Sequence, residues 1–425
     1  MSFADFQPFG ISRAAYDLSE QALSQVGPAF QAIAQVRETN QLRVISALQQ
    51  ARLAECHFGG STGYGYDDLG REQVERAYAL AFGAESALVR IQISSGTQAI
   101  ALCLFGLLRP GDELLSVTGA PYDTLMASIG TAGTPGDWGS LYDLGVSYRE
   151  IGLNPDGSPD LPAIQTALTT RTKVVFIQKS RGYTMRRSLR TADLSAICQA
   201  VRATGSQAII LVDNCYGEFV ETAEPCMVGA DLCAGSLIKN PGGGLCPSGG
   251  YVTGRAELVE KVACRLTAPG LGSHVGPSLG FSRLIAQGFY LAPHTVAESM
   301  KGAVFASALF QLAGFVTFPG PFEPRGDIVQ SIELAEPSRL IAFCQSIQAA
   351  SPVDSHVRPE PWDMPGYDSP VIMAAGAFIQ GSSSELSADG PLRAPYPAYL
   401  QGGLVFENVR LACLLAIERM GAAGK

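Results

Sequence analysis

Apolar residues recur at helical spacing over most of residues 1–55. Side chains three and four positions apart share one face of a helix, so this stretch is predicted to be helical. The glycines and tyrosines of residues 59–70 (GGSTGYGYDDLG) interrupt the pattern and predict a loop. Helical spacing then resumes at Val74 and stops near Gly83.

Short apolar runs alternate with amphipathic segments after residue 83. The runs that predict strands are 87–93, 113–117, 174–177, 208–212 and 232–237. The segments that predict helices are 99–107, 161–168 and 191–203. Strands that alternate with helices indicate βαβ units. The predicted fold class is therefore α/β, with a mostly parallel central sheet and helices on both faces.

The chain is too long for a single core of ordinary size, since it has 425 residues. Prolines and glycines cluster at 318–325 and 358–370, where the alternation of strands and helices ends. We expect an N-terminal helical arm over 1–58 that forms an interface. A large α/β domain is expected over 59–300 and a smaller α+β domain over 301–425.

Composition narrows the cellular setting and the partners. The hydrophobic share is 47% and the charged share 16%, which is typical of a globular protein and not of a disordered one. The net charge of −9 and the lack of a basic run argue against nucleic acid and acidic membranes as partners.

Targeting and redox signals point to the cytoplasm. No stretch reaches the roughly 18 apolar residues of a membrane helix, and the first residues lack the apolar region of a signal peptide. The ten cysteines contain no CxxC pair, which favours reduced thiols. The four histidines show no metal-ligand spacing, so no metal is expected.

Two residues that follow predicted strands suggest chemistry. Asp213 ends the apolar run IILVD, and Lys239 comes 26 residues later, between an apolar run and the glycines of NPGGG. Open α/β sheets bind ligands at this edge. A carboxylate there can keep a pyridine nitrogen protonated, and burial lowers the pKa of a lysine so that its free amine forms an imine. Taken alone, Asp213 is explained about equally well as a capping or Mg²⁺-binding acid. Taken alone, Lys239 is better explained as a surface lysine.

Three further segments fit a phosphorylated cofactor. Ser95, Gly96 and Thr97 precede a predicted helix, whose free N–H groups can bind phosphate. Ser236 stands three residues before Lys239, where its hydroxyl could reach the same phosphate. Tyr122 follows a strand, and its ring could stack on a pyridine ring. An ordinary helix cap and a structural turn tyrosine remain the alternatives for these segments.

These motifs together carry a resemblance. SGTQA, GAPY, VDNCYGEFVE, SLIKNPGGG and the late stretch FIQGSSSELSADGPLRAPYPAYLQGGL are similar to an aluminium-resistance or methionine gamma-lyase-like family of pyridoxal-phosphate (PLP) enzymes. That family is related to the cystathionine lyases. The resemblance implies the aspartate-aminotransferase-like fold, called fold type I, over nearly the whole chain.

The resemblance also implies residue roles. Lys239 would form the internal aldimine with PLP, and Asp213 would hold the pyridine nitrogen. Gly96, Thr97 and Ser236 would hold the phosphate, with Ser95 in the same turn. Tyr122 would stack on the cofactor.

The resemblance further implies shared active sites. Tyr64 and Tyr66 are similar in place to a tyrosine that reaches into a neighbouring subunit, which implies a homodimer or homotetramer. The cystathionine lyases have a Tyr-x-Arg pair there, whereas this chain has Tyr64-Gly65-Tyr66-Asp67. Arg71 is a weak substitute for the missing arginine.

The implied function is a carbon–sulfur lyase that acts on a sulfur amino acid of the cystathionine or methionine type, by β- or γ-elimination. Arginine holds a carboxylate through two hydrogen bonds, and Arg393 is the first candidate for this role, before Arg181. Other PLP chemistry on an amino acid, of the aminotransferase or aldolase type, is the alternative. A non-catalytic resistance or binding protein is disfavoured, because hard cations prefer clustered carboxylates and no acidic cluster occurs.

Overall fold

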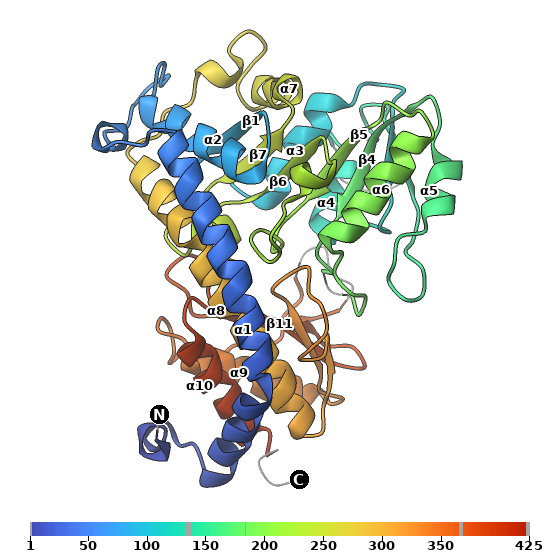
Figure 1. Ribbon diagram of the computed structural model, residues 1–425. Coiled ribbons are helices and arrows are strands. Elements are labelled where there is room, and N and C mark those ends of the chain that lie inside the picture. Colours follow the sequence, from blue (N-terminus) through green and yellow to red (C-terminus); the bar gives the residue numbers. More distant parts are fainter. Residues whose placement is uncertain (1, 132–137, 183, 365–368, 422–425) are drawn as a thin grey trace.

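The larger of two sheets organises the upper part of the molecule in the computed structural model, which describes residues 2–131, 138–182, 184–364 and 369–421 (Figure 1). Its strand order is β1-β7-β6-β5-β4-β2-β3, and only β7 runs antiparallel to its neighbours. The predicted, mostly parallel sheet is therefore confirmed. Its strands are β1 (Ser86–Arg90), β2 (Glu113–Ser116), β3 (Ser147–Glu150), β4 (Thr172–Gln178), β5 (Ile209–Asp213), β6 (Leu232–Ser236) and β7 (Gly250–Gly254).

Helices cover both faces of this sheet because its central strands are apolar on both sides. In β4, Val174 and Phe176 belong to one core, while Val175 and Ile177 belong to another. Continuous apolar runs of this kind are typical of parallel strands that are buried on both faces. The first face packs against α3 (Gly96–Leu107), α4 (Asp123–Ile129) and α7 (Ala256–Leu266); the second packs against α2 (Leu69–Phe82), α5 (Leu161–Ala167) and α6 (Thr191–Ala203).

The long N-terminal helix is shorter than predicted. Helix α1 spans Arg13–Gln50, and residues 2–12 contain two short 3-10 turns instead. Pro8 lies in the second turn, and Gly10 ends it with a positive φ of 76°. Ser12 then starts α1, because its side chain accepts a hydrogen bond from the Ala15 backbone N–H. The prediction of helix from residue 1 is therefore wrong for these residues.

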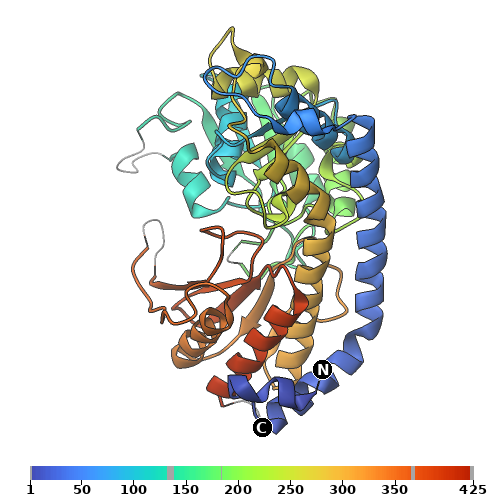
Figure 2. The same cartoon turned by 90° about the vertical axis from the view of Figure 1, so that its left-hand side faces the viewer.

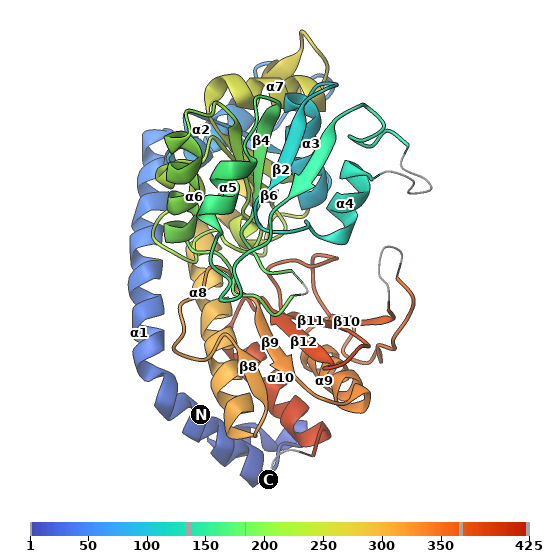
Figure 3. The same ribbon diagram turned by 90° about the vertical axis from the view of Figure 1, so that its right-hand side faces the viewer.

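A second, fully antiparallel sheet lies below the first (Figure 3). Its order is β10-β11-β12-β9-β8. Helices α9 (Pro337–Ala350) and α10 (Phe406–Arg419) pack on it and share its core. Its strands are β8 (Val316–Phe318), β9 (Gln330–Glu333), β10 (Val371–Ala375), β11 (Ser387–Pro391) and β12 (Pro397–Gln401).

Two long helices run side by side past both sheets (Figures 1 and 2). Helix α1 is about 57 Å long at 1.5 Å per residue, and it packs on α8 (Ser282–Leu312). Each helix contributes side chains to the core beneath the large sheet and to the core of the small sheet. The predicted boundary between residues 300 and 301 falls inside α8, so the division into domains stays a prediction. In the described part of the chain, no helix has the length and apolarity needed to cross a membrane.

Asn40 fastens α1 to the segment that follows Asp213. Its side-chain amide donates to the carbonyl oxygens of Phe219 (2.8 Å) and Glu221 (3.1 Å), and the residue is fully buried. Asn40→Ala would leave both carbonyls without this donor. We expect the variant to lose about 1–3 kcal/mol of stability, as measured by urea unfolding. Glu38→Ala, on the exposed side of the same helix, is the control. An Asn40→Ala midpoint equal to that of the control would contradict this role.

Candidate active site

The ends of β5 and β6 and the start of α3 meet at one edge of the large sheet. A Cβ atom on Gly96 would lie 3.0 Å from Cys215 Sγ and 3.3 Å from Ser236 Cβ. The backbone at the first turn of α3 is therefore pressed against both strand ends, in a space that a side chain would fill. Helix α3 points its free N–H groups into this region, and these groups can bind phosphate.

The neighbouring predicted residues form a hydrogen-bonded group. Ser95 caps α3, because its hydroxyl oxygen accepts from the Gln98 N–H at 3.0 Å. The Tyr122 hydroxyl donates to Thr97 Oγ1 at 3.3 Å, and the Tyr122 N–H donates to the Gln178 side chain at 3.1 Å. Tyr122 is thereby held across the sheet edge from Gly96. Burial raises the pKa of Tyr122, and the Asp213 carboxylate raises it further, so its phenol stays protonated.

Asp213 is buried at the C-terminal end of β5. Its Oδ1 accepts a hydrogen bond from the Cys215 N–H at 3.0 Å. Burial raises the pKa of Asp213, although the Cys215 N–H and the charge of Lys239 act in the opposite direction. A cationic donor such as a protonated ring nitrogen would stabilise the ionised form, so the site suits such a partner.

Lys239 lies just beyond β6, and its Nζ is 3.5 Å from the centre of the Tyr216 ring. Burial acts to lower the pKa of Lys239, but Tyr216, Cys215 and Asp213 together outweigh burial and raise it. The lowered pKa predicted from the sequence is therefore wrong for this chain. The late motif is also close to this lysine, since the Ser384 N–H donates to the carbonyl oxygen of the adjacent Ile238 at 2.9 Å.

Tyr216 was missed by the sequence analysis. It lies three residues after Asp213 and has a φ of 68°, which is rare for a bulky residue. The turn is fixed at Gly217, where a Cβ would lie 2.8 Å from Lys179 Cδ. Lys179 in turn donates to the Gly217 carbonyl at 3.2 Å. The motif DNCYGE held a signal for Tyr216. Its glycine predicts a turn directly after the strand that ends at Asp213, and a turn at that place passes the end of the neighbouring strand.

A buried acid lies behind this turn. The Tyr251 hydroxyl donates to Glu218 Oε1 at 2.7 Å, while Oε2 has no hydrogen-bond partner. Burial raises the pKa of Glu218 to about 8, against the opposing effect of the Tyr251 hydrogen bond. The backbone carbonyl of Glu218 also accepts a hydrogen bond, at 2.9 Å, from the side chain of Asn240, which follows Lys239 in the chain.

Tyr64 and Tyr66 lie on the surface, 71% and 57% exposed, with their ring centres 5.8 Å apart. No hydrogen bond or ring contact joins either tyrosine to Lys239, Asp213 or Tyr122 in the described residues. Within one chain the structure therefore does not bring them into the group around Lys239. Whether they reach a neighbouring subunit stays a prediction.

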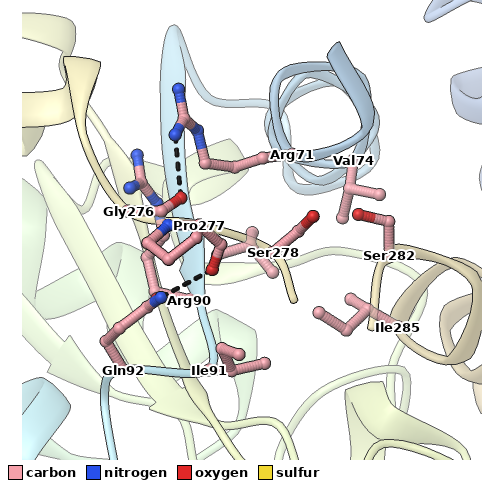
Figure 4. Close-up of a pocket in the computed structure, with 11 residues that line it drawn as sticks. Arg71, Val74, Arg90, Ile91, Gln92, Gly276, Pro277, Ser278, Ser282 and Ile285 are labelled. Atoms are coloured by element: carbon pink, nitrogen blue, oxygen red, sulfur yellow. Dashed lines mark hydrogen bonds between the residues drawn. The ribbon is translucent and has the colours of Figure 1, made fainter. Parts of the chain in front are cut away.

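Arg71 makes its contacts within its own chain, and a role in phosphate binding across a dimer stays a prediction. Its guanidinium is buried and donates to the carbonyl oxygens of Gly65 (2.6 Å) and Gly276 (2.8 Å). Figure 4 shows it directed at Gly276, in a small pocket between α2, β1 and the start of α8. It thus fastens the loop that carries Tyr64 and Tyr66. Apart from Arg71, no predicted cofactor or substrate residue lines this pocket.

The two candidate substrate arginines differ in burial. Arg393 is exposed in the turn between β11 and β12. Arg181 is fully buried beyond β4, where it donates to the Phe318 carbonyl at 2.8 Å. Both guanidinium charges act to lower the pKa of Tyr399, although burial acts more strongly and raises that pKa to about 12. The two arginines therefore approach the same strand, β12.

The raised pKa of Glu218 makes stability depend on pH. Its folded-state pKa of about 8 exceeds the ordinary value of 4.5. The folded protein therefore keeps a proton that the unfolded chain releases between these values, and stability falls as the pH rises from about 4.5 to about 8. Glu218→Gln keeps an acceptor for Tyr251 and cannot ionise. Between pH 5.5 and pH 8.5, we expect the melting temperature of this variant to fall by about 3–5 °C less than that of the wild type.

Thermal unfolding followed by fluorescence across this range measures the difference. Glu38→Gln, which changes an exposed acid on α1, should keep the wild-type profile. Parallel profiles for Glu218→Gln and the wild type would show that Glu218 is ionised in the folded protein throughout.

Known proteins resemble the chain over its full length. The protein YnbB of Bacillus subtilis (strain 168) is 49% identical over 388 residues, which is 91% of this chain and 92% of YnbB. A solved structure described as a carbon-sulfur lyase involved in aluminum resistance, from Clostridium novyi NT, is 46% identical. It covers 99% of both chains with a TM-score of 0.94.

A more distant solved structure confirms the fold. The pyridoxal-5'-phosphate dependent protein YhfS from Escherichia coli is 19% identical, covers 92% of this chain and 97% of its own, and has a TM-score of 0.60. The predicted fold type I is thereby confirmed. A model of the methionine gamma-lyase family matches residues 15–421. The chain belongs to the methionine gamma-lyase family.

Proposed function

We propose that this protein is a PLP-dependent carbon–sulfur lyase that acts on a sulfur-containing amino acid. The observation that supports the proposal is the meeting of Lys239, Asp213 and the first turn of α3 at one sheet edge. The charges of Lys239 and Asp213 act on each other, and Gly96 lies against Cys215 and Ser236. Membership of the methionine gamma-lyase family favours lyase chemistry among the reactions that such a site could support.

The residues present fit the cofactor. The backbone at Gly96 and Thr97, with the hydroxyl of Ser236 and the capped turn at Ser95, would hold the phosphate. The Asp213 carboxylate would accept the hydrogen bond of the ring nitrogen, and Tyr122 would lie on the ring. When bound, PLP supplies an electron sink that stabilises negative charge at the Cα atom of an amino acid.

Lys239 has two tasks in this proposal. Its Nζ would hold the cofactor covalently, and its free amine would take the Cα proton of the substrate. The tyrosine ring at 3.5 Å keeps Nζ at one place, since an aromatic face attracts a cation. Asp213 is buried, which keeps water away from its carboxylate, whereas Lys239 is partly exposed.

The bond that breaks joins sulfur to Cβ or Cγ. The thiol would leave with the proton that Lys239 took from Cα, and hydrolysis of the remaining enamine by water would give ammonia and a 2-oxo acid. Arg393 is our first candidate for the substrate carboxylate, because its exposed guanidinium is free to meet an entering ligand. Tyr64 and Tyr66 would complete the site of a neighbouring subunit in a homodimer or homotetramer, and their exposure supports this assignment.

Lys239→Ala tests the proposal. The wild type supplied with PLP should absorb near roughly 420 nm, and borohydride should fix the cofactor to the chain. The variant should lose both properties. Lys261→Ala, which removes an exposed lysine on α7, should keep them.

Product analysis identifies the reaction. Pyruvate from L-cystathionine or L-cysteine indicates β-elimination, and 2-oxobutyrate from L-methionine or L-cystathionine indicates γ-elimination. A PLP-binding wild type that releases neither product from any of the three would contradict lyase chemistry and favour an aminotransferase or aldolase reaction. A wild type that binds no PLP would overturn the whole proposal.

Gly96→Ala tests the phosphate position separately. The new methyl group would meet Cys215 Sγ at 3.0 Å and Ser236 Cβ at 3.3 Å, and would push the first turn of α3, whose N–H groups are assigned to the phosphate, away from both strand ends. Overpacking of this kind costs about 1–3 kcal/mol, so we expect PLP to bind about tenfold more weakly or worse. Titration of the protein with PLP, followed by absorbance, measures the change. Gly152→Ala, at a position with open space around it, is the matched control. Equal PLP affinity in both variants would place the phosphate elsewhere.

A further inference from the structure

Two buried arginines lie side by side beyond the end of β8. Arg181 comes from the loop after β4, and its Nη1 donates to the Phe318 carbonyl at 2.8 Å. Arg325 comes from the loop before β9, and its Nη2 donates to the next carbonyl, that of Pro319, at 3.4 Å. The two guanidinium groups therefore dock on successive peptide groups, one from each side of the junction between the two sheets.

Neither guanidinium group has a hydrogen bond to an acid in the part of the chain that the structure describes. In the described ranges, the two side chains hydrogen-bond only to carbonyl, hydroxyl and amide oxygens. Two acids influence both arginines without a hydrogen bond to either guanidinium: Asp327 and the exposed Glu323. The Asp327 carboxylate accepts from the Ser180 hydroxyl (3.1 Å) and from the backbone N–H groups of Arg181 (3.2 Å) and Val329 (3.1 Å). Its oxygens are thus occupied by other donors.

The positive charges of Arg181 and Arg325 repel each other, which raises the free energy of the folded protein. Burial lowers the pKa of Arg325 to about 9, and the charge of Arg181 lowers it further. Burial also lowers the pKa of Arg181. A buried charge without a counterion is among the most expensive features a fold can contain, whereas a paired one is tolerated.

Four buried N–H positions of the pair also lack an acceptor. Nε and Nη2 of Arg181 and Nε and Nη1 of Arg325 have no hydrogen-bond partner and no contact with solvent. A carboxylate offers two oxygens that match two such donors and adds a negative charge in direct contact with the pair. A bound carboxylate would therefore remove both costs at once.

We infer that Arg181 and Arg325 form a binding site for a carboxylate group, and that the substrate has this group in addition to its α-carboxylate. The second part rests on the proposed function. Arg393, which like Arg181 acts on Tyr399 of β12, remains for the α-carboxylate. An apolar distal group, as in methionine, would leave the pair unbalanced. A thioether with a second carboxylate, of the cystathionine type, would balance it.

Anion-dependent stability tests the site without catalysis. We would compare the melting temperature of the PLP-loaded protein in sodium acetate and in sodium chloride at equal ionic strength. Acetate should raise the wild-type value by about 1–2 °C, because it binds the folded state alone. Arg325→Gln should lose this rise, and Arg255→Gln, which changes a half-exposed arginine, should keep it.

Two results would overturn the site: a wild type that acetate stabilises no more than chloride does, or an Arg325→Gln variant that keeps the full rise. Arg325→Lys, which keeps the charge but has a single donor group, replaces the glutamine variant if that variant does not fold. It should show a reduced rise, and an undiminished rise would count against the site.

Substrate preference tests the second part. We expect Arg325→Gln to lower the ratio of kcat/KM for L-cystathionine to that for L-methionine by about tenfold or more, because it removes a charged donor from one substrate only. An equal loss on both substrates would overturn the inferred substrate class. If the wild type turned over neither of them, the inferred substrate class would fail, and the proposed function would fail with it if L-cysteine also gave no product; the acetate measurement would still decide whether the anion site exists.

Discussion

The close approach of α3 to the ends of β5 and β6 is the constraint on which the candidate site depends. The backbone at residue 96 lies so near Cys215 and Ser236 that a side chain would have to displace them. This contact sets where the free N–H groups of α3 point, and it fixes their position relative to Asp213 on β5. Lys239, beyond β6, then has a fixed place relative to both. The site therefore depends on the packing of the whole sheet edge, and no single loop is sufficient to form it.

Much of the large sheet could be predicted because its strands are short apolar runs that alternate with helices. β3 and β7 were not predicted. Ser147–Glu150 contains no apolar run because it forms the edge of the sheet, and Gly250–Gly254 is bounded by glycines that normally indicate a turn. The small sheet was harder still. β11, with the sequence SADGP, is entirely buried although it contains an acid, a glycine and a proline. Its burial comes from its neighbours, which a local pattern cannot reveal.

The same distinction applies to the site residues. Asp213, Ser236 and Gly96 could be found from their positions at strand and helix ends, since the topology of a parallel sheet brings such ends together. Tyr216 and Arg325 could not be found in this way. Tyr216 reaches Lys239 through a turn with a positive φ, and Arg325 reaches Arg181 only because the two sheets come together around residues 318–319. Contacts that depend on tertiary packing leave no periodic trace in the sequence.

Helix α8 belongs to two cores at once. Ile285 and Phe289, in its first half, pack beneath the large sheet, while Phe305 and Leu309, in its second half, pack with the small one. This arrangement restricts how such a chain can evolve. A recombination event at the middle of α8 could replace the small sheet. It would join two half-helices that had evolved with different packing partners, and both cores would then have to adapt together. The two sheets are thus inherited as one unit, even though each has its own topology.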